Sequence, residues 1–125
     1  MDLKASVCSI KLAKKLKLSG VPQRSFWHWN STKILSMEKG ERSISAFTTE
    51  ELGILLPAYI DFNLDKWDLT IAKEEQGWIV GYMNSEMAFL VVEQNENEVE
   101  ARAELLYNII QSELIVLLSK IKEAA

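Results

Sequence analysis

Cysteine is almost absent from this chain of 125 residues: Cys8 is the single one, so no disulfide can form within it. Nothing in the cysteine content indicates secretion into an oxidising compartment. Long hydrophobic runs are absent as well. Lysines interrupt the apolar residues at the N-terminus, and polar residues 111–113 break the apolar stretch near the C-terminus, which is far short of the roughly 20 residues of a membrane span. We therefore expect a cytoplasmic protein with no signal peptide and no membrane contact.

Residues that build common active sites are equally scarce. The chain has one histidine, His28, and its five glycines are scattered and form no phosphate-binding loop. A zinc site would need mostly carboxylate ligands, which zinc sites of the structural type rarely use. No serine lies in a nucleophile-elbow pattern. The sequence thus predicts no catalytic, cofactor-binding or metal-binding residues.

Charge, in contrast, is abundant and unevenly distributed. The net charge is −4, yet residues 1–42 carry nine Lys/Arg against three Asp/Glu, and residues 43–125 carry five against fifteen. Such asymmetry indicates either a basic surface for nucleic acid or a contact between oppositely charged parts of the chain. The candidate phosphate contacts are four lysines near the N-terminus: Lys4, Lys11, Lys14 and Lys15. The alternative is that these lysines form only the solvated face of a helix.

The first third of the chain predicts a helix followed by a hairpin. Residues 5–17 place apolar side chains on one side and lysines on the other, as in a helix packed against a core. Gly20 then supplies a stop for this helix. Residues 25–29 are aromatic and suit a strand, and residues 34–37 suit the return strand of a hairpin. The polar residues 39–45 are expected to form an exposed loop.

The middle of the chain predicts a second helix and then a sheet. Thr48 and Glu51 fit a capping box that opens the helix, and Pro57 ends it one residue earlier. From residue 67 the apolar period changes to two, and three strands joined by tight turns follow within residues 67–92. These strands predict an antiparallel meander.

The C-terminal quarter, Asn95 to Ile121, predicts one long helix with an apolar stripe that covers the meander. The members of this stripe are spaced three or four residues apart: Val99, Ala103, Leu106, Ile110, Leu114, Leu117 and Ile121. The predicted fold is one α+β domain over residues 1–125. It consists of an antiparallel meander and a short N-terminal hairpin, with the long C-terminal helix on the meander and two shorter helices upstream.

A second, narrower stripe on the same helix comprises Leu105, Ile109 and Val116. It packs either on the two shorter helices or on a second copy of the chain. A two-fold contact would use the same patch on both subunits, and exposed apolar patches commonly mark interfaces. This stripe is the basis for predicting a homodimer.

Aromatic residues on the hairpin form the third candidate site. Trp27, His28 and Trp29 form a ligand surface if the rings are exposed, because exposed aromatic rings stack on bases or sugars. Alternatively the tryptophans fill the core and His28 points away from them. Cys8, on the apolar side of the first predicted helix, is expected to be an inert core residue.

Four segments, residues 12–23, 26–29, 47–57 and 101–107, carry a resemblance that spans most of the chain. They include Leu-Ala-Lys-Lys-Leu-Lys, Gly-Val-Pro-Gln, Phe-Trp-His-Trp, Phe-Thr-Thr-Glu-Glu-Leu, Leu-Leu-Pro and Ala-Arg-Ala-Glu-Leu-Leu-Tyr. With these segments the chain resembles a group of uncharacterised small bacterial and prophage-associated proteins. That group has no assigned activity, so the resemblance implies an origin in a mobile element and no site residues.

Three functional hypotheses follow, in order of preference. The first is a non-catalytic intracellular interaction protein that self-associates. The second is a nucleic-acid-associated accessory protein that uses the basic first helix. The third is an enzyme of an unrecognised class.

Overall fold

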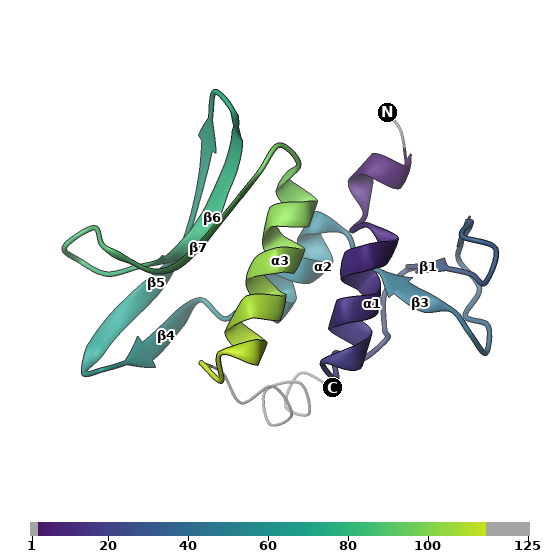
Figure 1. Ribbon diagram of the computed structural model, residues 1–125, viewed down its shortest axis with the longest axis horizontal. Coiled ribbons are helices and arrows are strands. Elements are labelled where there is room, and N and C mark those ends of the chain that lie inside the picture. Colours follow the sequence, from purple (N-terminus) through teal and green to yellow (C-terminus); the bar gives the residue numbers. More distant parts are fainter. Residues whose placement is uncertain (1–2, 115–125) are drawn as a thin grey trace.

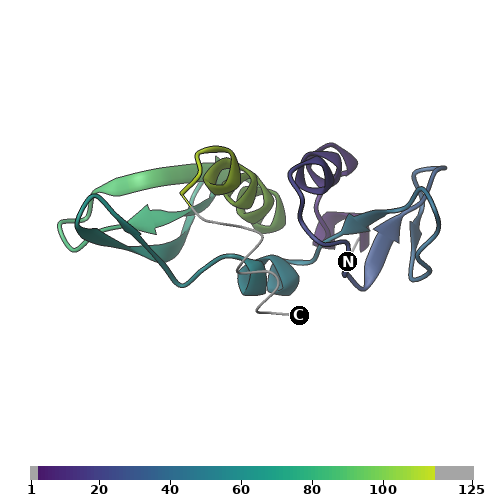
Figure 2. The same cartoon turned by 90° about the horizontal axis from the view of Figure 1, so that it is seen from below.

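The computed structural model describes residues 3–114, and these residues form an α+β fold with two antiparallel sheets, as the sequence predicts. In Figure 1 the four-stranded meander lies at one end of the longest axis and a three-stranded sheet at the other, with the helices between them. Figure 2 shows the same order of layers from below. Within residues 3–114, no helix is long and apolar enough to cross a membrane.

The first predicted helix is shorter than expected. A 3-10 helix, η1 (Leu3–Ser6), is followed by three non-helical residues, and α1 begins only at residue 10 (Ile10–Leu18). Cys8 lies in this non-helical part, where its N–H donates to the carbonyl of Phe47 at 2.9 Å. Ser9 caps α1, and its hydroxyl accepts from the N–H of Leu12 at 3.3 Å. This cap is the physical reason why the helix does not extend back to residue 5.

The predicted hairpin is confirmed, and it belongs to a small sheet of its own. Strand β1 (Trp27–Trp29) pairs antiparallel with β2 (Leu35–Ser36) on one side and with β3 (Ile44–Ala46) on the other. The strand order is β2-β1-β3, and this sheet is separate from the meander. The sequence predicted an exposed loop over residues 39–45. This prediction is wrong for its last two residues, because strand β3 begins at Ile44.

Helix α2 (Thr49–Leu55) has the predicted capping box. The Thr48 hydroxyl accepts from the N–H of Glu51 at 3.3 Å, and the Glu51 carboxylate accepts from the N–H of Thr48 at 2.9 Å. The helix ends at its cap Leu56, directly before Pro57, as expected.

The meander has four strands where the sequence predicted three. They are β4 (Tyr59–Phe62), β5 (Asp65–Glu74), β6 (Gly77–Met83) and β7 (Phe89–Asn95), in that spatial order. The additional strand, β4, pairs with β5 across a two-residue turn at Asn63 and Leu64, both with positive φ (57° and 64°). Such turns usually carry glycine. Since glycine is missing here, the sequence gives no hairpin signal.

Helix α3 (Glu98–Gln111) is shorter than the predicted helix over 95–121. After its cap Ser112, Glu113 has a positive φ of 57°, and the N–H of Leu114 donates back to the carbonyl of Ile109 at 3.0 Å. This left-handed residue closes the helix in the way that glycine usually does. The expectation of one continuous helix is therefore wrong at residues 112–114, and residues 115–121 lie outside the described residues.

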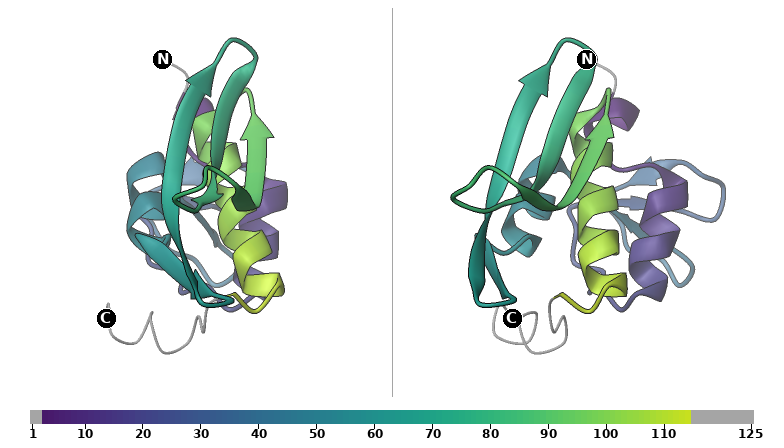
Figure 3. Two further views of the ribbon diagram at one scale, coloured as in Figure 1. Left: turned by 90° about the vertical axis from the view of Figure 1, so that its left-hand side faces the viewer. Right: turned by 60° about the vertical axis from the view of Figure 1, so that its left-hand side comes forward.

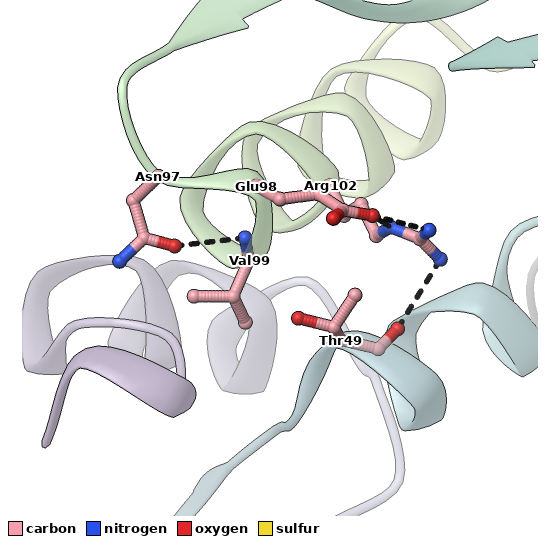
Figure 4. A network of polar contacts seen from close by, with 5 residues as sticks. All are labelled: Thr49, Asn97, Glu98, Val99 and Arg102. Carbon is pink, nitrogen blue, oxygen red and sulfur yellow. Dashed lines mark hydrogen bonds and ion pairs between the residues drawn. The ribbon is translucent and has the colours of Figure 1, made fainter. Parts of the chain in front are cut away.

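The N-terminal part of α3 is fixed to α2 by a polar network (Figure 4). The side chain of Asn97 accepts from the N–H of Val99 at 3.0 Å and caps the helix. Arg102 forms an ion pair with Glu98 one turn earlier and donates to the carbonyl of Thr49 at 3.3 Å. The network thus joins the first turns of both helices.

Helix α3 is the centre of the core. It packs against β6 and β7 on one side and against α1 and α2 on the other. Its main stripe is fully buried at Val99, Ala103 and Leu106 and partly buried at Ile110 and Leu114. Each fully buried leucine contributes about 1.5–3 kcal/mol, so this helix supplies a large share of the stability.

Candidate functional site

The residues predicted as a homodimer patch are not on the surface. Leu105 and Ile109 are both 0% exposed, because α3 is enclosed between the meander and the two shorter helices. Their burial lies within the chain, so the interface hypothesis is wrong for these two residues. Val116 lies outside the described residues.

The predicted phosphate-contacting lysines do not form one helix face. Lys11 and Lys14 are exposed on α1, but Lys4 lies in η1, and Lys15 places its ammonium 5.0 Å from the centre of the Tyr107 ring on α3. Such a cation–π contact orients the ammonium toward the body of the protein. Lys4, Lys11 and Lys14 are all exposed, and of these only Lys11 and Lys14 share a helix.

The predicted aromatic ligand surface is mostly internal. Trp29 is 5% exposed, and its indole N–H donates to the carbonyl of Cys8 at 3.0 Å. His28 is 4% exposed, and Trp27 is half-buried in an edge-to-face contact with Phe26, at 5.3 Å between ring centres. The interpretation of the three residues as a joint ligand surface is wrong, because His28 and Trp29 are buried and only Trp27 is partly exposed.

His28 belongs to a buried polar row across the small sheet. It pairs with Ser36 on β2 and with Ser45 on β3, so the three side chains share one face of the sheet. Burial lowers the pKa of His28, the charge of Lys39 lowers it further, and a hydrogen bond with the backbone of Ser25 partly opposes both. The imidazole is therefore neutral at pH 7.

This row is not arranged for nucleophilic chemistry. Nδ1 of His28 and the hydroxyl of Ser45 have no hydrogen-bond partner among the described residues, although they lie on neighbouring strands. Ser45 is 0% exposed, so a substrate cannot reach its hydroxyl. Within residues 3–114, no three His, Cys, Asp or Glu side chains lie close enough together to hold a metal ion.

The meander leaves one of its two faces open to solvent. The inner face packs against α3 and includes Val80 and Tyr82, both 0% exposed. The left panel of Figure 3 looks onto the other face, and no other element of the described chain lies in front of it. Because successive side chains of a strand alternate between faces, the strand register identifies the residues of this outer face.

We call this surface the open face, and its centre is apolar where a solvated sheet face is ordinarily polar. Phe89 is 38% exposed and Val92 44% exposed. The Phe89 ring lies over Gly81, where an added Cβ would meet ring carbon Cδ1 at 3.0 Å. The apolar and small residues of the open face are Tyr59, Thr70, Ala72, Ile79, Met83, Phe89 and Val92.

Carboxylates lie at both ends of the open face. At one end Asp68 pairs with Lys66 at 3.7 Å, and Asp61 lies beside them. At the other end, beside the turn between β5 and β6, a hollow of about 490 Å³ is lined by Glu74, Glu75, Gln76, Ile79 and Gln94. The open face is thus an apolar strip with carboxylates near both ends, one of which is paired with Lys66.

Sequence reasoning missed the open face, although a signal for it exists. In β6 the alternation Trp78, Val80, Tyr82 leaves Ile79 and Met83 on the other side, so both faces of this strand are apolar. An antiparallel sheet with one helical layer needs only one apolar face. The second apolar face indicates either a second covering layer or a binding surface.

Comparison with protein-family models, with curated proteins and with solved structures finds no match to this chain. The assignment of a functional surface therefore depends on the geometry described above.

Proposed function

We propose that the protein is a non-catalytic intracellular interaction protein that binds another polypeptide through the open face of the meander. The observation that supports this function is the strip of Ile79, Phe89 and Val92, which no described element covers. Apolar patches with a polar rim commonly mark protein-binding sites. Covering such a strip gains about 25 cal/mol for each Å² of apolar surface removed from water.

Site-specific photo-crosslinking in the cells that make the protein tests this function. A photoreactive phenylalanine analogue at position 92 is expected to give a covalent adduct of higher mass, because Val92 lies at the centre of the proposed contact. The matched control is position 54, since Ile54 is an aliphatic residue that is 80% exposed and belongs to α2, not to the meander. Equal adducts from positions 92 and 54, or none from position 92, would contradict the proposal.

A second candidate function is nucleic-acid binding through the basic N-terminal part. The ion pairs Lys66–Asp68 and Arg102–Glu98 lie on the meander and on α3. The exposed side chains of Lys11 and Lys14 supply a basic surface on α1. Phosphate contacts of this kind make binding strongly dependent on salt.

Heparin chromatography tests the second candidate. Retention is expected at about 50 mM salt and loss of retention by about 200 mM, because released counterions drive the binding. Lys11→Glu combined with Lys14→Glu should abolish retention, whereas Lys66→Glu on the meander should leave it unchanged. Flow-through of the unmodified protein at low salt would exclude this function.

A further inference from the structure

The charge asymmetry of the sequence becomes a separation of charge in space. Residues 3–47, here called the basic end, carry nine Lys/Arg and two Asp/Glu, whereas the meander, residues 59–95, carries seven Asp/Glu and two Lys/Arg. The small sheet of the basic end and the meander lie at opposite ends of the longest axis (Figures 1 and 2). The ion pairs Lys66–Asp68 and Arg102–Glu98 lie within the meander and within α3.

The basic end has an exposed apolar edge of its own, residues 33–39, which we call the hairpin edge. It contains β2, the outer strand of the small sheet, which pairs on one side only. Ile34 is 59% exposed and Met37 63% exposed, and exposed lysines, Lys33 and Lys39, stand at its two ends. Edge strands with free backbone groups are ready to receive another chain.

The hairpin edge complements the open face in apolar character and in net charge. The open face carries Asp61, Asp68 and Glu74 against Lys66, which pairs with Asp68. The hairpin edge carries Lys33 and Lys39 against Glu38, and all three are exposed. The two lysines can therefore face carboxylates of the open face while Ile34 and Met37 contact the apolar strip.

We propose that the open face of one copy binds the hairpin edge of a second copy, so that the chains associate head to tail. This inference rests on the proposed function and names the partner of the open face. Two open faces would bring like charges together, whereas open face and hairpin edge are opposite in charge. The contact is heterologous, so each copy keeps one unused surface, and the assembly extends into a chain or closes into a ring.

Sedimentation velocity of the full-length protein at low salt tests the proposal with two single variants. Val92→Lys blocks the open face, and Ile34→Glu blocks the hairpin edge. Each variant alone is expected to be monomeric, because it lacks one of the two surfaces. An equimolar mixture is expected to form dimers and nothing larger. The Ile34→Glu chain supplies an intact open face and the Val92→Lys chain an intact hairpin edge, so each chain can make only one contact. The unmodified protein should at least double its average mass and return to monomer at about 1 M salt, which screens charge.

Controls make these outcomes decisive. Ile54→Lys alters an exposed side chain on neither surface and should assemble as the unmodified protein does. Phe89→Lys and Met37→Glu repeat the mixing experiment with an independent pair, in case either first variant melts at a lower temperature.

Three results would overturn the inference. They are a monomeric unmodified protein at all concentrations, assembly by either single variant alone, and a mixture that stays monomeric. If the protein is monomeric but position 92 still gives adducts, the proposed function stands and only the self-association fails. If position 92 gives no adduct, both fail.

Discussion

Leu106→Asp is expected to unfold the protein at neutral pH. Leu106 is 0% exposed on α3, between the meander and the two shorter helices. Removing a buried leucine costs about 2–5 kcal/mol, and an unpaired charge in its place adds a further penalty of several kcal/mol. Because small domains are stable by about 5–15 kcal/mol in total, the substitution removes most or all of the stability.

Circular dichroism during heating measures this effect. The variant should show no cooperative transition, whereas Gln111→Asp, at an exposed position of the same helix, should melt within a few degrees of the unmodified protein. A Leu106→Asp protein with a sharp transition near the unmodified melting temperature would mean that α3 is not the centre of the core.

Alkaline pH is expected to destabilise the protein through Cys8 and Tyr82. Burial raises the pKa of the Cys8 thiol from 9.0 to about 12, and burial also raises the pKa of Tyr82, whose hydroxyl donates to the carbonyl of Pro57 at 2.7 Å. Both groups keep their protons in the folded state at pH values where the unfolded chain loses them. Their contribution is complete below pH 9 and is lost as the pH rises toward 12. The Cys8 shift corresponds to a loss on the order of 4 kcal/mol.

Urea unfolding at a series of pH values from 8 to 11 checks this prediction. The free energy of unfolding should be constant up to about pH 9 and then fall. In Cys8→Ala the fall should be shallower, although the variant is less stable at pH 8 because of the cavity it creates. Tyr82→Phe should make the fall shallower at higher pH. An identical pH dependence in Cys8→Ala would show that the thiol does not titrate with unfolding.

Local sequence signals predicted those elements whose boundaries depend on side chains nearby in the sequence. The capping box at Thr48 and Glu51 needs only three residues of spacing, so the start of α2 could be predicted. Helix and strand boundaries that depend on an unusual backbone conformation, and not on a characteristic residue, were not predicted. The turn at Asn63 and Leu64 and the end of α3 at Glu113 use positive φ without glycine, and their sequence resembles that of ordinary strand and helix.

The candidate site shows a different limit. A helix with two apolar stripes needs two partners, but the sequence does not reveal whether the second partner belongs to the same chain. Leu105 and Ile109 are 0% exposed within the described chain, which answers this for those residues. The open face could not be predicted from the sequence for a related reason. Apolar residues on both sides of β6 are visible in the sequence, but only the fold shows which side the helix covers.

The central place of α3 has a consequence for how the protein folds during synthesis. Everything that α3 covers precedes it in the sequence, and the N–H of Ser9 donates to the Glu100 carboxylate across 91 residues. Until α3 leaves the ribosome, α1, α2 and the inner face of the meander have no common partner. The earlier elements then expose apolar surface to chaperones for most of translation, and cooperative folding begins only when the last described helix is complete.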